Sequence, residues 1–153
     1  MCPSFPHYLK SLMREVTITN GEVLLYWELL ADVTSTNGLS SVKLFRIRDA
    51  LQREGAAVAS AFEEIDRRHA RQENGGTPVV IRNPEGEPLL WKRTKTPAYD
   101  TDPEKAGQRL VECAELDAGT VTIRVPLLNE QDLAWITANE QAGRALAAFT
   151  ESE

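Results

Sequence analysis

Residues 40–71 of this chain read SSVKLFRIRDALQREGAAVASAFEEIDRRHAR, and this stretch decides the fold. Its apolar and small residues recur at spacings of three and four, which places them on one face of a long helix. They are Leu44, Ile47, Leu51, Gly55, Val58, Phe62 and Ile65, with His69 next in the series. A helix of this length needs another element against its apolar face, so the sequence predicts a helical partner.

The opposite face of this helix is charged and carries acid-to-base pairs four residues apart. Each such pair stabilises a helix by about 0.2–0.5 kcal/mol. The pairs are Asp49 with Arg53, Glu63 with Arg67, and Glu64 with Arg68. Ser40 or Ser41 is expected to cap the start of the helix, and Asn74-Gly75-Gly76 to end the pattern. The charged face is therefore expected to be solvated.

The predicted partner is an apolar helix over Val23–Val33. Thr19-Asn20-Gly21-Glu22 precedes it as a capping box, in which Thr19 and Glu22 each satisfy a free backbone N–H. The connection between the two helices, residues 34–38, is short, and short connections make antiparallel neighbours. The sequence thus predicts a long antiparallel helical hairpin.

The remaining pattern alternates strand and helix signals. Strands are expected over 16–18 and 121–125, and a β-hairpin over 78–92 with its turn at 83–86, followed by a polar connection over 93–99. Asp102 and Pro103 begin a helix that Gly119 ends. The expected inner face of this helix consists of Ala106, Leu110, Val111, Cys113, Ala114 and Leu116. Asn129 and Thr137 open capping signals for a short turn and a terminal helix that holds Ala142, Leu146 and Phe149.

These elements predict an α+β fold, in which the helical hairpin packs with a small antiparallel β-sheet and C-terminal helices. One domain is expected over residues 16–150, after an irregular N-terminal arm over 1–15. The length of 153 residues is enough to bury a core. We also expect Trp27 and Trp135 to belong to that core.

Composition excludes several classes of protein. The net charge of −6 argues against a dedicated nucleic-acid binder, because phosphate neutralisation drives such binding. No apolar run is long enough to cross a bilayer, and the N-terminus lacks the pattern of a secretory signal. Two widely spaced cysteines, Cys2 and Cys113, favour a reducing compartment. The expected location is therefore intracellular, neither secreted nor membrane-spanning.

No catalytic constellation is visible in the sequence. Asp66 and His69 have the spacing of carboxylate–histidine metal ligands, but the only other histidine is His7, so an edge-of-core histidine is the favoured interpretation. Cys113 is expected to be a buried structural cysteine. The acidic residues Asp100, Asp102 and Glu104 are explained by helix capping. We therefore predict no catalytic, cofactor-binding or metal-binding residues, no cofactor and no enzymatic activity.

Two segments are candidates for contact with a protein partner. One is the N-terminal arm, through Phe5, His7 and Tyr8. The other is Trp91-Lys92-Arg93-Thr94-Lys95, where one aromatic ring stands beside three positive charges. Single-strand nucleic-acid binders combine these residue types, but the acidic chain favours a solvated hairpin end. The predicted contacts here are Trp91, Lys92, Arg93 and Lys95.

The order of these parts resembles a family of short, uncharacterised proteins of tailed bacteriophages. The likeness rests on ITNGEV at 18–23, LSSVKL at 39–44, EEIDRR at 63–68, PEGEP at 84–88, the helix from Asp102, and VTIRVPLL at 121–128 with EQDL at 130–133. It spans residues 16–149 and implies a viral, non-enzymatic role. The location that it implies is the virion or the host cytoplasm. A minor virion or assembly component is the first hypothesis. The alternative is an early host-directed inhibitor that binds a host nucleic-acid enzyme, such as RNA polymerase or a defence nuclease.

Overall fold

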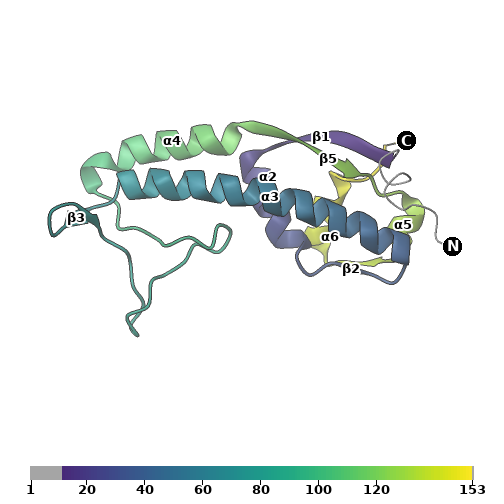
Figure 1. Cartoon of the computed structure of the whole chain (residues 1–153), viewed down its shortest axis with the longest axis horizontal. Helices are drawn as coiled ribbons and strands as arrows, with labels where there is room; N and C mark the ends of the chain where they lie inside the picture. The colour runs from purple at the N-terminus through teal and green to yellow at the C-terminus, as the bar shows by residue number, and fades with distance from the viewer. Residues whose placement is uncertain (1–11, 153) are drawn as a thin grey trace. The chain divides into compact units, whose positions relative to one another are not determined.

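A computed structural model describes residues 12–152 and shows an α+β chain, as predicted (Figure 1). The predicted contacts Phe5, His7 and Tyr8 lie outside the described residues. The elements are β1 (Met13–Thr19), α2 (Asn20–Leu30), β2 (Thr34–Ser35), α3 (Gly38–Arg68), β3 (Gln72–Glu73), β4 (Thr77–Pro78), the 3-10 turn η1 (Pro103–Lys105), α4 (Ala106–Ala118), β5 (Thr120–Pro126), α5 (Glu130–Ala134), β6 (Ile136–Thr137) and α6 (Glu140–Ala147).

The chain divides into two compact units where the sequence analysis expects one domain. The first unit contains the residues up to Ile18, then Leu25–Arg53, and the chain from Thr120 onward. The second unit contains Thr19–Leu24 and Glu54–Gly119. Helices α2 and α3 therefore each supply one segment to each unit. The expected irregular arm over 1–15 is too long, because residues 13–15 already belong to β1.

Helix α3 confirms the long helix and its buried face. Leu44, Ile47 and Leu51 have no exposed surface, and Val58 and Ile65 are also buried. Its cap differs from the prediction: Asn37 Oδ1 accepts the N–H groups of Leu39 and Ser40, at 3.0 and 3.2 Å. Ser40 is buried instead and bonds elsewhere. The helix ends at Arg68 rather than Arg71, because the chain turns there toward β3.

The first unit holds most of the fully buried bulk of the chain. β1 pairs with β5, where the Thr17 and Thr122 hydroxyls lie 2.8 Å apart, and β2 pairs antiparallel with β6. Phe149 follows α6 and is completely buried, with its ring edge-on to Tyr26 at a centroid distance of 5.8 Å. Other side chains with no exposed surface in this unit are Leu30, Leu44, Ile47, Leu51, Val125 and Leu128.

Side chains cap the first turns of several helices, largely as the sequence predicts. The Thr19 hydroxyl accepts the Glu22 N–H at 3.0 Å, and Glu22 returns a bond to the Thr19 N–H, which completes the predicted capping box. Asp102 caps η1, and Gly119 ends α4. One cap differs from the prediction. The N-cap of α6 is Asn139, whose side chain accepts the Ala142 N–H, and not Thr137.

Between β4 and α4 the chain forms an irregular projection, residues 79–101, which we name the arm (Figure 1). The predicted turn at 83–86 is present, with Gly86 N–H bonded to the Asn83 carbonyl. The predicted strands over 78–92 reduce to isolated antiparallel bridges, such as Arg82 with Pro88. Four prolines, at 78, 84, 88 and 97, remove the donors that a continuous ladder needs.

The sequence predicted a polar connection over residues 93–99, but the structure shows that this segment also pairs with the hairpin. Its second half runs back along the hairpin, so that three backbone segments bond in a ring. Ile81 N–H donates to the Ala98 carbonyl, Ala98 N–H to Leu89, and Leu89 N–H to Ile81, at 2.8, 2.8 and 2.9 Å. Arg71, Asp100 and Val79 form a second such ring. The N–H groups of these six residues are therefore already used.

Candidate functional site

Most of the large apolar side chains that are exposed belong to the second unit. Of the eight large hydrophobic residues that are exposed among those described, six lie in the arm or on α4. Their exposed fractions run from 40% for Ile81 to 64% for Leu110. We name these six the contact residues: Ile81, Leu89, Leu90 and Trp91 of the arm, and Leu110 and Val111 of α4. The other two, Phe45 and Trp135, belong to the first unit, and Trp135 is half exposed rather than in the core as predicted.

The outward position of Leu110 and Val111 corrects the predicted inner face of α4. Polar contacts decide which side of this helix meets α3. Arg109 Nε donates to the Asp66 carboxylate at 2.7 Å, and Arg68 donates to Glu112 at 3.1 Å. Leu110 and Val111 each lie about a third of a turn from one of these paired residues, so their side chains point away from α3. No described residue of α4 is fully buried, and this includes Cys113, which is only half-buried rather than buried as expected.

His69 is the buried, edge-of-core histidine that the sequence favoured. Its Nδ1 lies 2.6 Å from the Ile65 carbonyl oxygen, and its Nε2 lies 2.6 Å from Glu112 Oε2. A carbonyl only accepts, so Nδ1 carries a proton. Within residues 12–152 no group of three or more His, Cys, Asp or Glu is placed to hold a metal ion.

The structure brings Trp91, Lys92, Arg93 and Lys95 together in one exposed turn at the end of the arm. Lys95 N–H donates to the Trp91 carbonyl, and Trp91 N–H donates to Thr96, both at 2.8 Å. Lys95 has a φ of 59°, a left-handed conformation that tightens the turn. The predicted contacts of this segment are therefore neighbours and reachable from solvent, and Trp91 is among the contact residues.

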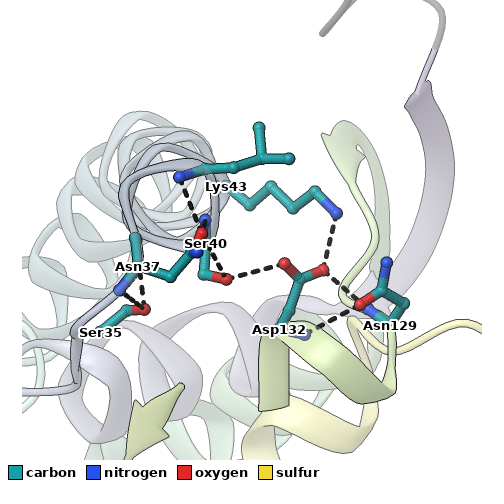
Figure 2. A network of polar contacts seen from close by, with 7 residues as sticks. Ser35, Asn37, Ser40, Lys43, Asn129 and Asp132 are labelled. Atoms are coloured by element: carbon teal, nitrogen blue, oxygen red, sulfur yellow. Dashed lines mark hydrogen bonds and ion pairs between the residues drawn. The ribbon is translucent and has the colours of Figure 1, made fainter. Parts of the chain in front are cut away.

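A buried polar cluster in the first unit was missed by the sequence analysis (Figure 2). Figure 2 shows Ser40 at one oxygen of the Asp132 carboxylate, and Lys43 and Asn129 at the other. Lys43 Nζ lies 2.6 Å from Asp132 Oδ2, and the Ser40 hydroxyl donates to Oδ1 at 2.8 Å. Asn129 N–H donates to Oδ2 at 2.9 Å, and Asn129 Oδ1 accepts the Asp132 N–H. This cluster joins α5 to the first turns of α3.

Electrostatics identify the cluster as a structural clamp. Burial alone would raise the pKa of Asp132, but the hydrogen bonds from Lys43, the Asn129 backbone and Ser40 outweigh it and hold that pKa below its usual value. Asp132 is therefore ionised at neutral pH and matched by the Lys43 ammonium. Both oxygens of the carboxylate have partners, and Lys43 and Asp132 are each less than 5% exposed. A group this enclosed has no access to a substrate.

Comparison of the chain with protein-family models, curated proteins and solved structures finds no match. Among residues 12–152, no helix combines the length and apolar character required to cross a bilayer. We therefore infer the surface through which the chain acts from its own geometry.

Proposed function

We propose that the chain has no catalytic activity of its own and acts by protein–protein contact through the contact residues of the second unit. The observation that carries the proposal is their concentration. Single exposed hydrophobic residues are normal on any protein, whereas groups of them indicate interaction sites. Six of the eight described here fall within residues 81–111.

The backbone of the arm supports contact through side chains rather than through strand addition. A partner strand needs free N–H and C=O groups along an edge. In the arm, the N–H groups of Ile81, Leu89 and Ala98 already donate to one another's carbonyl groups in a closed ring. A partner would therefore cover Leu89, Leu90 and Trp91, while Lys95 at the adjoining turn favours an acidic border on that partner.

The proposed class of partner follows from the resemblance to phage proteins. A minor virion or assembly component is the first proposal, and mass spectrometry of purified particles tests it, because a virion component must be present in them or in assembly intermediates. The alternative is a host-directed inhibitor, for which the net charge of −6 favours a basic groove on a host nucleic-acid enzyme.

Affinity capture with matched variants tests the contact residues themselves. Leu89→Ser, Leu90→Ser and Leu110→Ser are combined in one variant of the full chain. Phe45→Ser with Trp135→Ser serves as the control, because these two residues are equally exposed but lie in the first unit. We expect a stoichiometric partner in capture from infected cells with the wild type and the control, and its loss with the triple variant. Equal capture by all three chains contradicts the proposal.

A further inference from the structure

A cavity of about 430 Å³ lies within the second unit, beside the Trp91–Lys95 turn of the arm. This volume falls in the range of small-molecule sites. Its walls come from three directions: Phe62 of α3, Arg109 and Cys113 of α4, and Trp91, Lys92 and Arg93 of the arm. The cavity is distinct from the outward face of α4 that carries Leu110 and Val111.

The charges that line the cavity favour an anion. Lys92, Arg93 and Arg109 are cationic, whereas Asp66 and Asp117 are anionic. Asp66 is occupied, because one oxygen accepts from Arg109 Nε at 2.7 Å and its side chain is only 8% exposed. Asp117 lies against the first turn of α2, where a side chain on Gly21 would collide with its carboxylate. A helix N-terminus compensates a negative charge in that position.

Arg109 has the geometry of an anion ligand. Its bond to Asp66 uses Nε, and among the described residues no acceptor other than Asp66 bonds its guanidinium. The two terminal nitrogens of a guanidinium match the two oxygens of a carboxylate or the oxygens of a phosphate. The Asp66 bond also fixes the orientation of Arg109, so little side-chain freedom is lost when an anion binds.

The rest of the wall supplies aromatic and neutral surface. Trp91 and Phe62 line the cavity, and aromatic side chains of this kind can stack on the ring of a ligand. Burial raises the pKa of the Cys113 thiol, and Arg109 opposes this shift only in part. The thiol is therefore neutral at pH 7 and adds no charge to the cavity.

We propose that this cavity is a binding site for a small aromatic anion, whose carboxylate, sulfonate or phosphate pairs with Arg109 while its ring lies between Trp91 and Phe62. The site goes beyond the contact function, because it is formed by the inner side of the arm and of α4. Trp91 is the one contact residue that also lines the cavity. The variant with Leu89→Ser, Leu90→Ser and Leu110→Ser keeps Trp91, so it separates ligand binding in the cavity from partner binding at the contact residues.

The probe is 8-anilinonaphthalene-1-sulfonate, an aromatic sulfonate, and the reporter is alkylation of Cys113 by N-ethylmaleimide in a Cys2→Ser chain. A bound probe covers the thiol. At a probe concentration about ten times the Kd, mass action predicts alkylation about tenfold slower. Arg109→Lys keeps the charge beside Asp66 but loses the paired terminal nitrogens, so we expect about tenfold weaker binding, the worth of one charge-assisted hydrogen bond. The same probe concentration should then slow alkylation of this chain only about twofold.

Arg124→Lys, an exposed arginine of β5 in the first unit, is the matched control and should protect Cys113 as the parent chain does. Trp91→Ala, at a half-exposed position, should weaken protection without unfolding the chain. Three results overturn the proposal: no protection at millimolar probe, equal protection in the Arg109→Lys and parent chains, or a rise in probe fluorescence without protection of Cys113. The last would place the probe on the exposed contact residues instead.

Discussion

The two units of this chain differ in how much large apolar surface they bury and how much they leave exposed. The first unit buries an ion pair, Lys43 with Asp132, among completely buried apolar side chains such as Leu44 and Phe149. The second unit leaves Leu90, Trp91 and Leu110 about half exposed or more, and joins α4 to α3 through polar contacts. A buried, satisfied charge specifies one arrangement, whereas exposed apolar surface is available to a partner. We therefore attribute stability mainly to the first unit, and the contact that we propose to the second.

The largest effect should follow from breaking the buried pair of the first unit. Asp132→Asn leaves the Lys43 ammonium buried without its counter-charge, which typically costs about 3–5 kcal/mol. Lys43→Met combined with Asp132→Asn removes both charges and should cost clearly less than Asp132→Asn alone. Urea unfolding of the three chains measures this difference. A single variant as stable as the parent chain would show that the pair does not hold the first unit together.

Acid should weaken the first unit through the same group. The pKa of Asp132 is lowered in the folded chain relative to the unfolded value of about 3.9. Its contribution to stability is therefore complete above that value and is lost as the pH falls through the lowered folded pKa. Between pH 5 and acid conditions the parent chain should lose more unfolding free energy than the Lys43→Met, Asp132→Asn chain. Urea unfolding midpoints across this range provide the measurement, and parallel slopes would contradict the assignment.

The smallest effect on stability is expected at the arm. Leu90→Ser removes an apolar side chain that is 57% exposed to solvent. Surface substitutions of this kind usually change stability by no more than about 0.5 kcal/mol. Thermal unfolding should therefore be nearly unchanged. A large loss would mean that Leu90 is part of a core, and the contrast between the two units would weaken.

Local sequence rules predicted what depends on neighbouring residues. The buried face of α3 and the capping boxes at Thr19 and Asn129 follow from spacings of three and four residues, and the structure confirms them. Rules of this range could not orient α4. Leu110 and Val111 read as an inner face, but the partners that turn the helix, Asp66 and Arg68, lie more than forty residues earlier in the chain.

The buried cluster illustrates the same limit with a visible clue. Lys43 follows Ser40 by three residues and precedes Ile47 by four, which places a cation on the apolar face of α3. A charge on a buried face requires a partner, so its presence could be suspected from the sequence. The identity of that partner could not, because Asp132 lies 89 residues away. Trp91, Lys92, Arg93 and Lys95 could be grouped from the sequence because they are adjacent in it, and their contact with a partner stays a prediction.

Site-specific photo-crosslinking tests the central claim most directly. A photo-reactive phenylalanine analogue replaces one exposed residue at a time: Leu90 or Leu110 in the second unit, and Phe45 or Trp135 as matched positions in the first. After irradiation of infected cells, we expect protein adducts from positions 90 and 110, and none from positions 45 and 135. Adducts confined to positions 45 and 135, or absent from all four, would contradict the assignment of contact to the second unit.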